Sequence, residues 1–83
     1  MAKHSKHSKA WKGVILMQLG ERVKHLRLEK KFTQNDLADK IYVSRSLISQ
    51  IEHGKANPAK SVLTSLSDVL GTTVYYLVHG EDE

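Results

Sequence analysis

The chain has 83 residues, no cysteine and a formal net charge of +4 at pH 7. A chain of this length folds as one domain and has no room for a deep pocket lined by its own core, so a binding module is expected rather than an enzyme. The lack of cysteine excludes disulfides and thiolate metal sites, and apolar runs such as residues 14–17 are far too short for a membrane span or a signal peptide.

Positive charge is concentrated at the start of the chain. Residues 1–13 hold four of the thirteen lysines and arginines and no acid, residues 14–80 stand at +3, and the tail, residues 81–83, is wholly acidic. This arm has no apolar period, so we expect it to be flexible and to approach an anionic partner such as nucleic acid. A solvated tail without a partner, or a stretch foreign to the natural chain, is the alternative. Its histidines are not expected to hold a metal ion.

The first two helices are marked by spacing and by a capping residue. Apolar residues recur every three or four positions from Leu16 to Leu26, which predicts a helix over about residues 16–30. Thr33 is a good N-cap for a second helix over about residues 34–41, whose apolar residues face inward.

A third helix is expected over about residues 45–53, capped by Ser44 and ended by Gly54 in the left-handed conformation. Its apolar residues share one arc: Leu47, Ile48 and Ile51. The opposite arc is short, polar and rich in hydrogen-bond donors, and it carries Arg45, Ser46, Ser49, Gln50 and His53. Arginine suits the guanine edge, glutamine can pair with adenine and serine with either, so this arc suits a DNA major groove. An ordinary solvated face is the alternative, although such faces are usually richer in glutamate and lysine.

A fourth helix is expected over about residues 59–70, closed by Gly71. Its start is open: Asn57 could cap it with Pro58 at the first helical position, or it could begin one or two residues later. A short fifth helix covers about residues 74–78. No segment alternates with a period of two, so the sequence predicts five helices and no sheet.

Several motifs follow one another along the chain in a single register: LGERVxxLR from Leu19, TQxxLA from Thr33, VSRSLISQIEHGK from Val43, NP at Asn57, LxxLSxVLG from Leu63 and GTTVYYLVHG from Gly71. Together they resemble the Cro and phage-repressor helix-turn-helix family, also called XRE-type, over about residues 17–80. The resemblance implies a compact, all-α, five-helix lambda-repressor-like DNA-binding domain, which we place at residues 14–80 behind the flexible basic arm. In that fold the second and third helices form the helix-turn-helix, and the third lies in the major groove.

Matching positions also imply roles for single residues. The base-reading set corresponds to Arg45, Ser46, Ser49 and Gln50. Phosphate contacts correspond to Gln34, Ser44, His53, Lys55 and Asn57. An ion pair that joins the first helix to the third corresponds to Arg27 and Glu52. Five large residues in a row, residues 74–78, cannot all face one small core. We therefore expect the last helix and the loop before it to form the dimer interface, with Val74, Tyr75 and Val78.

Two positions depart from the family pattern. Tyr42 stands in the turn between the second and third helices, where the family usually has glycine. We expect Tyr42 to take a positive φ there, at a steric cost of roughly 1–2 kcal/mol. Ala59 stands where a capping serine is frequent, which puts the start of the fourth helix in doubt.

The sequence therefore predicts a cytoplasmic transcriptional regulator, a repressor of bacterial or phage origin. It is expected to bind double-stranded operator DNA as a homodimer, with recognition helices about 34 Å apart. The same architecture also serves as an antitoxin with a toxin partner, as the DNA-binding half of a longer sensor, or as a protein-interaction module without DNA binding. We expect no catalytic residues, cofactor, metal ion or membrane contact.

Overall fold

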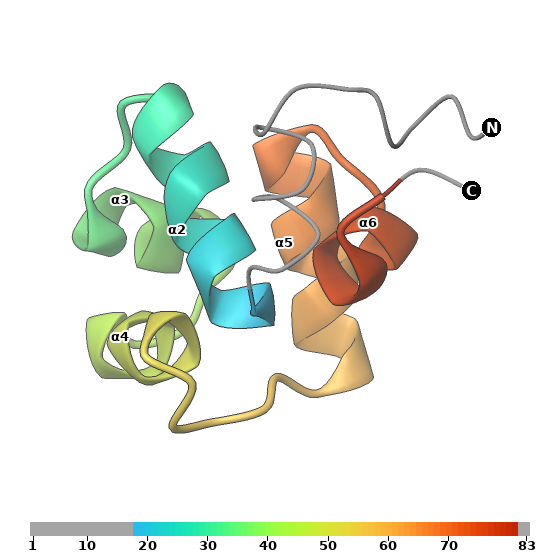
Figure 1. The fold of residues 1–83 in the computed structure, drawn as a ribbon. Helices are drawn as coiled ribbons and strands as arrows, with labels where there is room; N and C mark the ends of the chain where they lie inside the picture. Colours follow the sequence, from blue (N-terminus) through green and yellow to red (C-terminus); the bar gives the residue numbers. More distant parts are fainter. Residues whose placement is uncertain (1–17, 82–83) are drawn as a thin grey trace, which may run out of the picture.

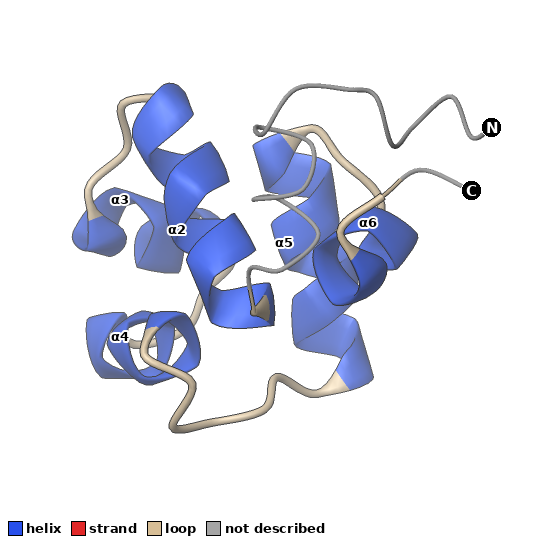
Figure 2. Ribbon diagram, in the orientation of Figure 1, coloured by secondary structure: helices blue, strands red, loops and turns tan. Residues whose placement is uncertain are grey.

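The structure, a computed structural model, describes residues 18–81. This part of the chain forms five helices and no strand (Figures 1 and 2): α2 (Leu19–Glu29), α3 (Gln34–Lys40), α4 (Arg45–Glu52), α5 (Lys60–Leu70) and α6 (Val74–His79). The predicted all-α class is confirmed for these residues. The basic arm, Leu16 and the last two residues of the acidic tail lie outside the described range.

The core lies around α2, which contacts α4, α5 and α6, while α3 packs on α4. Figure 1 shows α2 in the middle, with α3 and α4 on one side and α5 and α6 on the other. Each of the five helices contributes to the largest fully buried side chains: Val23, Leu37, Ile48, Ile51, Leu66 and Leu77. Burial of one such side chain contributes roughly 1.5–3 kcal/mol, so these contacts are what hold the short helices together.

The predicted N-caps of α3 and α4 are present. Thr33 Oγ1 accepts a hydrogen bond from the Asp36 amide at 2.9 Å, and the Asp36 carboxylate accepts from the Thr33 amide at 2.8 Å. The bond from the Thr33 backbone is the main reason why the pKa of Asp36 is lowered. Ser44 Oγ accepts from the Leu47 amide at 3.0 Å. Each cap satisfies an amide that the helix cannot pair by itself. The two helices of the helix-turn-helix therefore begin directly after their capping residues.

The start of α5 decides between the two alternatives that the sequence left open. The helix begins at Lys60 after Ala59, whose backbone is extended and whose side chain makes no capping bond. Asn57 is therefore not the cap and Pro58 is not the first helical residue, and the later of the two expected starts is the observed one. Proline fixes its own φ but does not force the next residue into a helix. Gly71 closes α5 with φ 71°, as predicted.

Tyr42 lies in the α3–α4 turn with φ 60°, which confirms the predicted left-handed conformation. Its side chain is 93% exposed, so little packing offsets the backbone strain. Lys31 also has a positive φ, of 63°, and was not predicted from the sequence.

We expect the substitution Tyr42→Gly to stabilise the fold by up to about 1–2 kcal/mol, because glycine removes the steric penalty of a positive φ. The greater freedom of glycine in the unfolded chain offsets part of this gain. Chemical denaturation measures the difference. Lys30→Gly is the control: Lys30 is exposed with φ −88°, so glycine relieves nothing there and should destabilise. Equal losses in the two variants would contradict the strain at Tyr42.

Candidate nucleic-acid interface

The two faces of α4 differ sharply in burial. Ile48 and Ile51 are buried in the core, and Leu47 is half-buried beside them. The outer face of α4 carries Arg45, Ser46 and Gln50 as exposed side chains and Ser49 as a half-buried one. The structure therefore places all four predicted base-reading residues on one solvent-facing side of a helix whose other side is fixed.

The segment after α4 is held by its own backbone. Gln50 O accepts hydrogen bonds from the Lys55 amide at 2.8 Å and the Ala56 amide at 3.3 Å, around Gly54 with φ 74°. Lys55 and Asn57 are exposed on this segment. The backbone of Lys55 thus has a defined position relative to the outer face of α4.

His53 is the C-cap of α4 and is exposed. Its Nδ1 lies 2.8 Å from Ser49 O. A carbonyl oxygen can only accept, so Nδ1 carries the proton and donates. This bond fixes the ring and leaves Nε2 as its other polar atom.

Gln34, the first residue of α3, is only partly available to a phosphate. Its Nε2 donates to Glu52 Oε1 at 3.0 Å, and the residue is half-buried. The side chain therefore joins α3 to α4. An anion at this end of α3 would meet the helix N-terminus, whose first amides and dipole favour negative charge.

Arg27 and Glu52 form the ion pair that the family resemblance implied. Arg27 Nε and Nη2 donate to Glu52 Oε2 at 2.6 Å and Oε1 at 3.1 Å, and Nη1 donates to Phe32 O at 2.8 Å. Both side chains are buried. Two parallel bonds between a guanidinium and a carboxylate fix orientation as well as distance, so α2 holds the C-terminal end of α4 in place.

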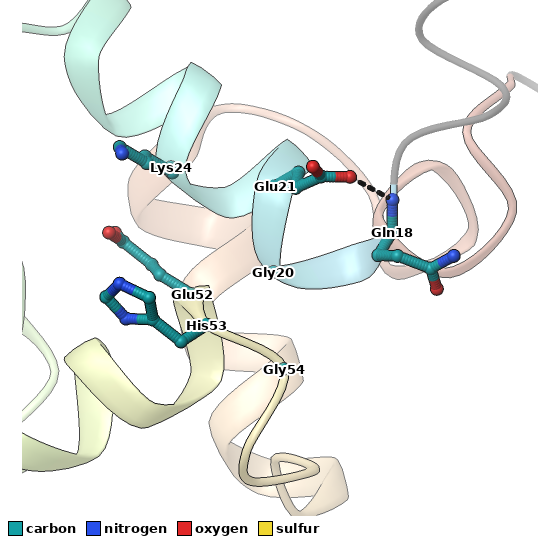
Figure 3. Close-up of a pocket in the computed structure, with 7 residues that line it drawn as sticks. All are labelled: Gln18, Gly20, Glu21, Lys24, Glu52, His53 and Gly54. Carbon is teal, nitrogen blue, oxygen red and sulfur yellow. Dashed lines mark hydrogen bonds between the residues drawn. The ribbon is translucent and has the colours of Figure 1, made fainter.

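Gly20 makes a second contact between α2 and α4 that the sequence analysis missed. A Cβ at Gly20 would lie 2.7 Å from Glu52 O and closer still to Ile51 O. Only glycine permits this approach of the two helices. Figure 3 shows Gly20 beside the end of α4 at Glu52 and His53. These residues line a hollow of about 380 Å³, together with Lys24 and Glu21. In the sequence, the glycine of the LGER motif could have indicated this close approach.

The predicted dimer residues lie on α6. Tyr75 and Val78 are 37% and 42% exposed, Val74 is half-buried, and Leu77 between them is fully buried in the core. The rings of Tyr75 and His79 lie 4.3 Å apart between centroids. Within residues 18–81 no helix has the length and apolar character that a membrane span requires.

The sequence of this chain matches known helix-turn-helix proteins. A family model described as helix-turn-helix matches residues 23–77. The immunity repressor protein of Bacillus phage phi105 is 41% identical over 66 residues, which are 80% of this chain and 45% of that protein. The HTH-type transcriptional activator BcrR of Enterococcus faecalis is 38% identical over 66 residues, 80% of this chain and 32% of that protein. This chain thus spans less than half of either relative.

Among solved structures, the P22 c2 repressor in complex with a synthetic operator superposes with a TM-score of 0.76 at 32% identity. The match covers 78% of this chain and 98% of the repressor chain. The observed arrangement of α2 to α6 is therefore similar to that of a domain that was solved on DNA.

Proposed function

The chain belongs to the Cro and phage-repressor (XRE-type) helix-turn-helix family, and from this premise we propose that it regulates transcription by binding double-stranded operator DNA with α4 in the major groove. One observation carries the proposal: the outer face of α4 presents Arg45, Ser46 and Gln50 to solvent while its inner face is locked in the core. A helix held in this way can present donors to base edges without rearranging.

Repression is the sign of regulation that we propose. The phi105 relative and the P22 structural neighbour are both named repressors, whereas BcrR is named an activator. A domain that occupies operator DNA represses by excluding other proteins from it, and it needs no further part to do so. We favour repression because two of these three similar proteins are named repressors.

Base readout and phosphate contact are assigned to different residues. We propose that Arg45, Ser46, Ser49 and Gln50 read bases from the outer face of α4. Phosphates are assigned to residues at the helix ends and in the segment after α4: Gln34, Ser44, His53, Lys55 and Asn57. Phosphate contacts set the register of the protein on the duplex and carry no sequence information.

A second copy of this chain is the proposed partner on DNA. The exposed residues of α6, Tyr75 and Val78, with half-buried Val74, form the proposed dimer face. Leu77 already fills the core from the same helix, so these side chains remain for a partner. Two-fold symmetry then implies a two-fold symmetric operator, with half-sites about one DNA turn apart.

Selection of bound sequences from random duplex DNA tests the proposal. The wild type should select a two-fold symmetric motif. Arg45→Ala and Gln50→Ala should each lose about 1–3 kcal/mol on that motif and relax the preference at one base pair per half-site, because each removes a base contact.

Lys55→Ala is the matched control in the same experiment. It should weaken binding to all sequences alike and reduce the slope of log K against log salt by about one, because it removes one phosphate contact. If all three variants select the wild-type motif unchanged, α4 does not read the bases and the assignment of its outer face is wrong.

A further inference from the structure

Arg22 is a buried cation on α2 that has no role in the proposed DNA contacts. The residue is 4% exposed. Its Nε donates to Leu77 O at 2.8 Å, and its Nη2 donates to Val78 O at 2.8 Å. Both carbonyls belong to the last turn of α6, where helix oxygens lack partners within the helix and the dipole is negative. Arg22 therefore holds the C-terminal end of α6 on α2.

This contact matters because α6 is too short to be stable by itself. It has six residues, and isolated helices shorter than about 12 residues are marginal in water. Thr73 caps its start and Leu77 anchors it in the core. The bond to Val78 O has a further consequence, since the Val78 side chain is 42% exposed on the proposed dimer face. Arg22 thus fixes the backbone of a residue whose side chain faces the proposed partner.

The same helix also fixes α4. Arg27, five positions beyond Arg22, pairs with Glu52 at the end of α4. Gly20, two positions before Arg22, lies against the carbonyls of Ile51 and Glu52. Because α2 is one uninterrupted helix, these contacts relate the orientation of α6 to that of α4 through a single rigid element.

We propose that Arg22 is a positioning residue that sets the half-site spacing: it fixes the dimer face of α6 relative to the recognition helix α4. The inference rests on the proposed function, since it requires two copies of this chain on symmetric DNA. A tilt of α6 would displace the recognition helix of the partner, which lies about 34 Å away, by much more than it displaces α6 itself. Spacing should therefore be more sensitive to Arg22 than base preference is.

The test uses duplexes that carry two copies of the selected half-site at a series of separations, and duplexes that carry one. Binding is compared for the wild type, Arg22→Gln and Arg22→Lys, at a temperature at which circular dichroism shows each protein folded. Lys24→Gln is the control, because Lys24 is an exposed lysine on the same helix and loses the same charge. Arg22→Lys keeps the charge but not the planar guanidinium that donates to two carbonyls at once. It is the test variant if Arg22→Gln does not fold.

Arg22→Gln should lose about tenfold in affinity for the two-site duplex, as expected for the loss of a charge-assisted hydrogen bond, and should accept a wider range of separations. Its affinity for a single half-site and its base preferences should stay as in the wild type. Arg22→Lys should show a smaller change in the same direction, and Lys24→Gln should keep the wild-type spacing.

Two results would overturn the inference alone: folded Arg22 variants that keep the wild-type spacing preference, or a half-site affinity that falls as much as the two-site affinity. A wild type that selects no two-fold motif would instead overturn the proposed function, and this inference with it.

Discussion

Replacing Glu52 with alanine should destabilise the fold by about 3–5 kcal/mol, because it leaves the buried Arg27 guanidinium without its counter-charge. Only the bond to Phe32 O would remain among the three that Arg27 donates in the structure. Arg27→Ala should cost a similar amount, since the buried Glu52 carboxylate would keep only the neutral donor of Gln34. Such losses are a large part of the 5–15 kcal/mol that typically separates folded and unfolded states. Chemical denaturation of the two variants measures them.

The exposed pair on the same helix is the matched control. His25 Nε2 lies 3.1 Å from Glu29 Oε2, with both side chains about half exposed. Glu29→Ala should change the stability by no more than about 0.5 kcal/mol, because solvent screens such a pair. The double variant Arg27→Ala, Glu52→Ala should lose less than the sum of the single losses, since it leaves neither charge unpaired. Wild-type stability in both single variants would show that the pair is not important for the fold.

Local signals made most of the helix ends predictable. The hydroxyls of Thr33 and Ser44 accept hydrogen bonds from backbone amides, as their positions just before apolar-periodic segments predicted. Gly71 has the positive φ that a helix-closing glycine takes. These features depend on a few neighbouring residues. The start of α5 was left open for the same reason, because Ala59 supplies no side-chain signal and the competing signals of Asn57 and Pro58 are weak.

Resemblance to a family, rather than periodicity, located the buried ion pair. Arg27 and Glu52 are 25 positions apart in the sequence, and no spacing rule connects them. Tyr42 was likewise identified by the glycine that usually stands in its place. Arg22 was missed, although it is as buried as Arg27, because its partners are backbone carbonyls 55 and 56 positions away. In the sequence alone, an arginine on a helix suggests a solvated charge. Its burial becomes clear only when the packing of α6 on α2 is known.

Gln34 shows the limit of a role assigned by matching position. Its place at the start of α3 was predicted, and so was the positive end of the helix dipole that lies there. Its bond to Glu52 depends on how α3 crosses α4, which neither periodicity nor capping specifies. The outer face of α4, by contrast, follows from the helical period alone, and it is the part of the candidate site that the sequence defined best.

The substitution Gly20→Ala should destabilise the fold by about 2 kcal/mol, even though alanine is the better helix former. In a helix the exchange would ordinarily gain about 1 kcal/mol. Here the new Cβ would lie 2.7 Å from Glu52 O and closer to Ile51 O. Both oxygens belong to the backbone of α4, so no flexible side chain can move aside, and overpacking of this kind typically costs about 1–3 kcal/mol or more. The clash outweighs the propensity gain, and relief requires α4 to move away from α2.

Thermal melts of Gly20→Ala and Lys24→Ala separate the two effects. Lys24 is exposed one turn further along α2, so alanine there tests helix propensity without a clash and should leave the stability nearly unchanged. Any Gly20→Ala protein that remains folded should also bind the operator more weakly, because the displaced end of α4 carries Gln50 and is followed by His53 and Lys55. A Gly20→Ala protein as stable as the wild type would show that α2 and α4 do not approach as closely as the structure describes. The role of α2 in orienting the recognition helix would then rest on the Arg27–Glu52 pair alone.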